Sequence, residues 1–111
     1  MKNAEVWLID FNPQVGAEVK KMRPAIIVSN NAVGSLPLKI VVPVTDLSKG
    51  KMLWHVELKP NKINGLTKSS VADCFQVKSI SENRFVKKIG KLSEEEMVNI
   101  KATLMLVMDI V

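Results

Sequence analysis

The feature that most limits the fold of this chain is a series of short segments rich in β-branched and aromatic residues, separated by turn signals. Asn12-Pro13, Asn30-Asn31 and the turn at Gly65 separate such segments, and Pro, Gly and Asn at these places favour turns between strands. The predicted strands cover residues 4–11, 24–29, 38–45, 54–59, 69–77 and 85–92. Strands this short and this closely spaced predict a mostly β fold with antiparallel pairing, closed into a small barrel.

A single helix is predicted after the last strand. Ser93 and Glu96 have the spacing of a capping box, in which each side chain accepts a hydrogen bond from the other residue's backbone amide. Apolar residues then recur at steps of three and four, which predicts one stripe that packs on the sheet. They are Met97, Ile100, Leu104, Val107, Met108 and Val111. The other face carries Met105, Leu106 and Ile110, which indicates that a partner buries part of this helix.

Length and composition narrow the class further. A chain of 111 residues forms one core, so a single domain over residues 1–111 is expected. The 16 Lys and Arg residues exceed the 11 Asp and Glu residues, and the net charge of +5 suggests a polyanionic partner, although a solvated basic surface would look the same. Pro43, inside the strand over 38–45, predicts an edge or a bulge there.

Several function classes are not expected. Cys74 is the only cysteine, so no internal disulfide can form, and no Cys/His cluster offers metal ligands, so neither a metal nor a cofactor is expected. The first ten residues contain Glu5 and Asp10 and lack the apolar run of a secretory signal. No run of about eighteen apolar residues could span a membrane. We therefore expect a soluble cytoplasmic protein.

A set of short motifs occurs in one order along the whole chain. They are Pro13-x-x-Gly16-x-Glu18, RPAIIVSNN from Arg23, VVPVTD from Val41, Gly65-Leu66 followed by SSVADCFQ, and IGKLS before the helix. As a collinear set they resemble the MazF/PemK toxins. The resemblance implies an SH3-like barrel of five to six or more strands, a homodimer, and a metal-independent endoribonuclease (mRNA interferase) that cuts single-stranded RNA. It also implies a type II toxin–antitoxin pair, in which a labile antitoxin blocks the substrate groove.

By this resemblance Arg23 and Thr45 match the family's catalytic arginine and threonine. Metal-free RNA cleavage uses the 2′-hydroxyl as an internal nucleophile, and the phosphate then needs charge stabilisation. The planar guanidinium of Arg23 suits this role, because it donates two parallel hydrogen bonds and Pro24 pre-sets its backbone. The alternative is a surface ion pair of Arg23 with Glu18 or Asp46. Thr45 can donate to a phosphate oxygen or to the leaving group, or it can simply form a turn.

Other candidate residues support the same site. Glu18 can accept the 2′-hydroxyl proton, order its loop, or be a solvated carboxylate. Lys20, Lys21 and Asp46 are expected to contact the substrate, and Gln76 can bind a base edge or be a satisfied polar residue. Further lysines that can attract an RNA backbone are Lys49, Lys51, Lys78, Lys87 and Lys88.

The remaining residues give weaker indications. The only histidine, His55, is expected to be structural or solvent-facing rather than a general base. With five aromatic residues in the chain, a base-stacking platform is not favoured, and Trp7 and Trp54 are assigned to the core or an interface. In the PemK/Kid branch an arginine and an aspartate join the catalytic set near Cys74. This chain has Asp73 and Phe75 there, so that assignment does not transfer.

Two rival functions remain. Gyrase inhibitors of the CcdB type share the barrel but end in Trp-Gly-Ile, whereas this chain ends in Met108-Asp109-Ile110-Val111, which weighs against them. A catalytically silent module that binds nucleic acid or an antitoxin is the other alternative.

Overall fold

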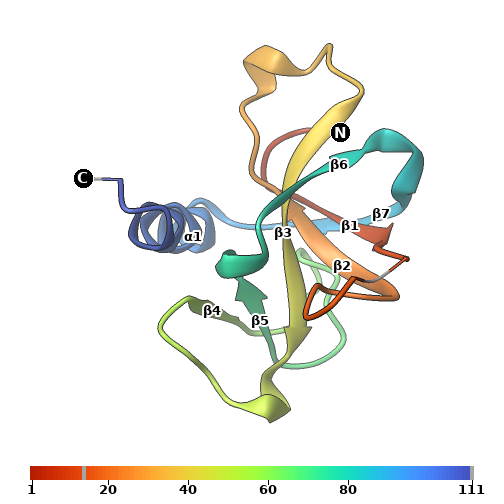
Figure 1. Cartoon of the computed structure of the whole chain (residues 1–111). Coiled ribbons are helices and arrows are strands. Elements are labelled where there is room, and N and C mark those ends of the chain that lie inside the picture. Colours follow the sequence, from red (N-terminus) through yellow and green to blue (C-terminus); the bar gives the residue numbers. More distant parts are fainter. Residues whose placement is uncertain (14, 111) are drawn as a thin grey trace.

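A computed structural model describes residues 1–13 and 15–110, and within them the chain forms one antiparallel sheet and one α-helix (Figure 1). The strands and the helix are β1 (Glu5–Asp10), β2 (Met22–Ile27), β3 (Leu38–Asp46), β4 (His55–Leu58), β5 (Ser70–Asp73), β6 (Lys78–Ser81), β7 (Phe85–Lys91) and α1 (Glu94–Val107). Short 3-10 turns are η1 (Asn31–Val33), η2 (Leu47–Lys49), η3 (Cys74–Gln76) and η4 (Glu82–Arg84). The predicted mostly β architecture with a C-terminal helix is confirmed.

The long strand β3 is the centre of the sheet, which has the order β4-β5-β3-β2-β1-β7. One side of β3 pairs with β2, and the other side pairs first with β6 and then with β5. Pro43 lies between these last two pairings. The Ile40 carbonyl points toward β2, where it accepts a hydrogen bond from the Val28 amide at 2.9 Å. Backbone groups alternate sides along a strand, so the Pro43 nitrogen points away from β2, toward the gap between β6 and β5. The missing N–H therefore removes no ladder bond. The sequence predicted an edge or a bulge at Pro43, and β3 is instead an interior strand whose pairing changes from β6 to β5 at this residue.

The segment predicted as one strand over residues 69–77 instead forms the strand β5 and the 3-10 turn η3. Strand β5 ends at Asp73, whose carboxylate accepts a hydrogen bond from the Phe75 amide at 3.2 Å and caps η3. The chain then continues as β6, a four-residue strand that the sequence pattern did not separate. Strand β2 begins at Met22, two residues before the predicted start, which places Arg23 inside the strand.

The sheet does not close by strand pairing within the described residues, because no pairing joins its end strands β4 and β7. The loop after β4 bridges them instead. The Lys91 amide donates to the carbonyl of Ile63 at 2.9 Å, and the backbone of Asn64 passes directly over Gly90. Closure through a loop replaces the closed hydrogen-bonded barrel that the sequence predicted.

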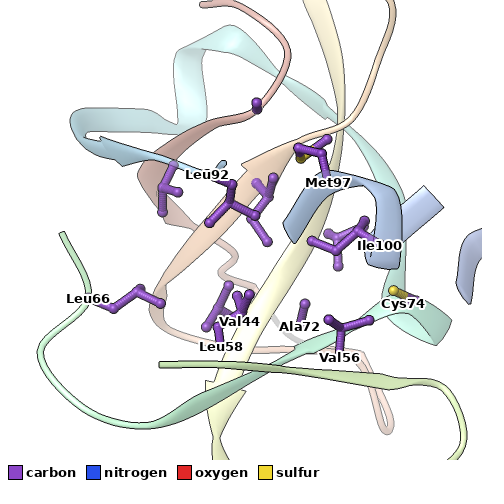
Figure 2. Packing of buried hydrophobic residues seen from close by; sticks show 13 residues of the cluster. Val44, Val56, Leu58, Leu66, Ala72, Cys74, Leu92, Met97 and Ile100 are labelled. Atoms are coloured by element: carbon purple, nitrogen blue, oxygen red, sulfur yellow. The ribbon is translucent and has the colours of Figure 1, made fainter. Parts of the chain in front are cut away.

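Alternation along the strands gives the sheet two apolar faces. On one face α1 covers the larger core, where Met97 and Ile100 meet Val44 and Ala72, with Leu92 at the start of the helix (Figure 2). The residues of the smaller core on the other face are Ile9, Phe11, Ala25, Ile27, Val41 and Ile80. Trp7 and Phe85 pack against the smaller core with ring centroids 5.7 Å apart.

Helix α1 begins with the predicted capping box, in which the Ser93 hydroxyl accepts from the Glu96 amide at 3.1 Å. Only its first turns are fully covered by the sheet, and the predicted stripe becomes exposed at Met108, while Val111 lies outside the described residues. The exposed apolar residues of this segment are Val98, Met105, Leu106, Met108 and Ile110. Among the described helices, none has the length and apolar character to cross a membrane.

The close approach at Gly90 predicts the effect of Gly90→Ala. An added Cβ would overlap the carbonyl group of Asn64 and lie 2.6 Å from the carbonyl oxygen of Ile63, so the bridging loop must move. We expect the free energy of unfolding to fall by about 1–3 kcal/mol in urea titrations. Lys91→Ala, on an exposed neighbour, should change it by less than about 0.5 kcal/mol. Equal stability of the two variants would contradict this role of the loop.

The buried carboxylate of Glu5 joins the N-terminus to β1 and β7. It accepts from the Lys2 amide at 3.0 Å and the Trp7 indole at 2.9 Å, and it pairs with the Lys88 ammonium at 3.2 Å. Burial alone would raise the pKa of Glu5, but these hydrogen bonds outweigh it and lower the pKa from 4.5 to about 2. The ionised form is therefore the one that stabilises the fold.

Glu5→Gln tests this linkage. The pKa of Glu5 is lowered on folding, so its contribution is present above pH 4.5 and is lost as the pH falls toward 2. The variant should lose on the order of 2 kcal/mol of unfolding free energy at pH 7, and the difference from wild type should shrink in urea titrations between pH 4.5 and 2. Glu57→Gln, on an exposed position of β4, is the control. A difference that does not vary with pH would refute the linkage.

Candidate active site

The pairing of β2 with β3 brings Arg23 and Thr45 to one place. The register joins Ala25 to Pro43, and Arg23 and Thr45 lie two residues beyond this pair in their own strands. Because side chains alternate along a strand, both project on the face of the smaller core, at facing positions. Both are half-buried, at the point where that apolar face gives way to polar residues. Two residues far apart in sequence thus become neighbours through register alone.

A cleft of about 420 Å³ lies in front of this pair. The residues that line it are Ala17, Glu18, Val19, Lys20, Arg23, Thr45, Asp46, Gly50, His55, Asp73 and Gln76. A second cleft of about 340 Å³ shares Arg23, Thr45 and Asp46 and continues past Lys68 and Lys87. The two clefts therefore form one groove with the Arg23–Thr45 pair at its middle.

Six of the seven candidate site residues from the sequence line this groove: Glu18, Lys20, Arg23, Thr45, Asp46 and Gln76. The seventh, Lys21, does not line either cleft. Its backbone has a positive φ of 67°, and its amide donates to the Asn12 side chain at 3.0 Å. The left-handed backbone at Lys21 sends the chain from the loop into β2, so Lys21 serves the turn rather than the groove.

Arg23 lacks the ion pair that was its alternative explanation. Among residues 1–13 and 15–110, none forms a hydrogen bond or an ion pair with the Arg23 guanidinium. Asp46 is already engaged, because it accepts from the Ser48 amide at 2.9 Å and from the Lys68 ammonium at 3.0 Å. These two bonds lower the pKa of Asp46 to about 2, so the carboxylate is ionised and its charge is met elsewhere. The Arg23 guanidinium is therefore not neutralised by Asp46.

His55 lies in the wall of the cleft, where the sequence did not place it. It stands opposite Asp73 in the β4–β5 ladder, with its Nε2 atom 3.8 Å from the Asp73 carboxylate. Its Nδ1 atom accepts from the Met52 amide at 3.0 Å, so the ring proton of the neutral imidazole is on Nε2 and faces Asp73. The hydrogen bond to Nδ1 fixes the ring with Nε2 beside Asp73, so His55 lines the cleft wall as a positioned neighbour of that carboxylate. Only the strand register, invisible in the sequence, could reveal this pair.

Gln76 ties the β1–β2 loop to the sheet. The Val19 amide donates to its Oε1 atom at 3.1 Å, and its Nε2 atom donates to the Ala17 carbonyl at 3.0 Å. The start of the same loop is held by Arg84, which donates to the carbonyls of Asp10 and Asn12. Gln76 thus holds the segment that carries Glu18 and Lys20 into the cleft, and its amide is not free to read a base.

The cysteine beside this site is not a nucleophile. Cys74 is fully buried under α1, and burial together with the charge of Asp73 raises its pKa to about 12. Within the described part of the chain, no three His, Cys, Asp or Glu side chains form a group that could hold a metal ion.

A small antiparallel sheet with an open groove that carries an unpaired arginine and three lysines, Lys20, Lys68 and Lys87, can bind a polyanion. Comparison with family models gives the class: residues 2–108 match the family described as PemK-like, MazF-like toxin of type II toxin-antitoxin system. The chain belongs to this family, which confirms the resemblance found in its motifs.

Curated relatives agree with this assignment. Endoribonuclease MazF9 of Mycobacterium tuberculosis is 29% identical over 99% of this chain and 98% of its own length. Endoribonuclease MazF of Staphylococcus epidermidis is 31% identical over 90% of this chain and 84% of its own length.

Solved structures show the same fold. MazF from Deinococcus radiodurans superposes with a TM-score of 0.85 at 22% identity and covers 99% of this chain and 97% of its own. An endoribonuclease in complex with its cognate antitoxin from a mycobacterial species has a TM-score of 0.80 at 17% identity, over 100% and 97%.

The hydrogen bonds of Gln76 predict how its loop responds to substitution. Gln76→Ala removes two neutral hydrogen bonds, each worth about 0.5–1.5 kcal/mol. Amide hydrogen exchange should therefore become about 5- to 150-fold faster in residues 15–20. Protection in β2 and β3 should be unchanged. Ser79→Ala, on an exposed position of β6, should leave exchange in the loop as in wild type, and an equal effect of both substitutions would contradict the tie.

Proposed function

We propose that this chain is an endoribonuclease that cuts single-stranded RNA without a metal ion, as the toxin of a type II toxin–antitoxin pair. The observation that carries the proposal is the Arg23 guanidinium, which has no partner among the described residues and stands beside Thr45 in the middle of an open groove. An unpaired, half-buried arginine is costly unless it binds an anion. The scissile phosphate is that anion, and this weighs against a catalytically silent module.

The groove residues divide the chemistry among them. The 2′-oxygen forms a bond to phosphorus, and the bond from phosphorus to the 5′-oxygen breaks, which leaves a 2′,3′-cyclic phosphate and a 5′-hydroxyl. Arg23 donates two parallel hydrogen bonds to the non-bridging oxygens as their negative charge grows. Thr45 donates to a phosphate oxygen or to the departing 5′-oxygen. Both side chains rise from sheet strands, so little reorganisation is needed.

A proton must leave the 2′-hydroxyl, and Glu18 is the carboxylate that we assign to it. The other two carboxylates of the cleft are occupied, Asp46 by Ser48 and Lys68, and Asp73 by Phe75 and His55. The Glu18 side chain is exposed and has no hydrogen bond or ion pair within the described residues. It is therefore the free acceptor, and the 5′-oxygen takes its proton from solvent.

Substrate attraction comes from lysines along the groove. Lys20 lines the first cleft, and Lys68 and Lys87 line the second. With a net charge of +5, the protein should bind RNA in a salt-dependent manner through these phosphate contacts. Gln76 and Asp46 act on the substrate indirectly, because Gln76 positions the loop and Asp46 holds Lys68.

The assembly that we propose is a single toxin domain acting as a cytoplasmic homodimer that a cognate antitoxin inhibits. The exposed apolar half of α1 supports a protein partner on this face. The mycobacterial structural relative is described in complex with its cognate antitoxin.

The test is cleavage of a long RNA in excess chelator by wild type, Arg23→Ala and Thr45→Ala. Wild type should release fragments with cyclic phosphate and 5′-hydroxyl ends, mapped by sequencing. Arg23→Ala should lower the rate about 10²- to 10³-fold, as expected for loss of a transition-state donor, and Thr45→Ala should lower it at least tenfold. Lys62→Ala removes one charge outside both clefts and should cut normally.

Two results would disprove the proposal. One is an RNA left intact by wild type in the chelator. The other is a rate for both Arg23→Ala and Thr45→Ala that equals the rate of Lys62→Ala.

A further inference from the structure

The groove continues beyond the residues that serve the chemistry. A third cleft of about 340 Å³ is lined by Ala17, Glu18, Phe75, Gln76, Val77 and Lys78. It shares Ala17, Glu18 and Gln76 with the cleft in front of Arg23, so the two are continuous past the β1–β2 loop. Its volume is at the lower end of small-ligand pockets, which suits a single flat group.

Phe75 is the exposed aromatic residue of this cleft. Its side chain is 66% exposed, and it belongs to neither apolar core. Exposure of so large an apolar group has no benefit for the fold, because burial of an aromatic ring is among the largest sources of stability. The position of Phe75 therefore needs another explanation.

The ring of Phe75 is held in place and still has a free face. Its backbone is fixed by the hydrogen bond from its amide to Asp73. Its ring meets Trp54 edge to face, with centroids 5.9 Å apart and an interplanar angle of 65°. In this geometry Trp54 covers at most one face of the Phe75 ring, and Phe75 stays largely exposed in the lining of the cleft. A preset ring with a free face is what base stacking requires.

We propose that Phe75 is a stacking platform for one unpaired RNA base next to the scissile phosphate, with Lys78 beside it. This inference rests on the proposed function. The small number of aromatic residues in the sequence did not favour such a platform. A single ring at the end of the groove is nevertheless enough to stack one base. The Lys78 ammonium can donate to a ring nitrogen or carbonyl of the base. The site therefore contributes to sequence selectivity as well as to affinity.

The test separates binding from cleavage. A short RNA spanning a mapped cleavage site, with deoxyribose at the scissile position, has no nucleophile and can only bind. Its affinity should fall about 10- to 100-fold with Phe75→Ala, as for loss of one stacked base. Phe75→Trp should bind like wild type, and Phe75→Leu, which keeps apolar area without a π face, should be intermediate. Leu53→Ala removes an even more exposed apolar group outside all three clefts and should not change affinity.

An abasic scan of the same RNA identifies the stacked base. Removal of that base should weaken binding to wild type but have little further effect on Phe75→Ala, because the two changes remove one interaction. Equal losses for intact and abasic RNA would show that Phe75 acts only on the structure, and would overturn the proposal. A change of oligomeric state in light scattering with Phe75→Ala would also overturn it, since the ring would then belong to an interface between copies.

The two proposals fail differently. If wild type cuts RNA and Phe75→Ala binds the uncleavable RNA as tightly as wild type, the stacking site is wrong and the enzyme stands. If the uncleavable RNA binds with the predicted dependence on Phe75, but Arg23→Ala and Thr45→Ala both cut as fast as Lys62→Ala, the proposed chemistry is wrong and the base site stands.

Discussion

The active groove depends on the register between β2 and β3. Pairing of Ala25 with Pro43 sets Arg23 and Thr45 at facing positions, and a slip of one residue would turn one of these side chains toward the α1 core. The register is itself held by burial, since Ile26 and Val42 belong to one core while Ala25, Ile27 and Val41 belong to the other. The same apolar alternation that stabilises the sheet therefore aligns the two polar groups of the site.

The capped turn after β5 is the second element on which the site depends. Asp73 ends the strand, and the side chains of the next three residues have different surroundings. Cys74 lies in the α1 core, Phe75 lies at the groove beside Trp54, and Gln76 bonds to the β1–β2 loop. A continuous strand could not do this, because its side chains alternate between two faces only. The turn thus connects the core, the groove and the loop in one short segment.

Among the described residues, no carboxylate of the groove forms an ion pair with the Arg23 guanidinium. Asp46 and Asp73 are close to Arg23 in the cleft wall, yet each already has hydrogen-bond donors of its own. An arginine neutralised by a carboxylate would have to exchange that partner for each phosphate. In the proposed mechanism, an arginine without a partner can bind the phosphate directly, because its position on a paired strand is set before the ligand arrives.

Local patterns in the sequence determined most of the elements: the strands before residue 60, the last strand, the capping box at Ser93 and the motif residues Arg23 and Thr45. The tertiary structure decided what those patterns do not encode. Long-range pairing split the segment over 69–77, opened the barrel, and placed His55 against Asp73. It also tied Gln76 to the loop, moved Lys21 out of the groove and exposed Phe75. Each of these outcomes depends on hydrogen bonds or contacts between residues distant in sequence, and residue type and local spacing carry no information about such partners.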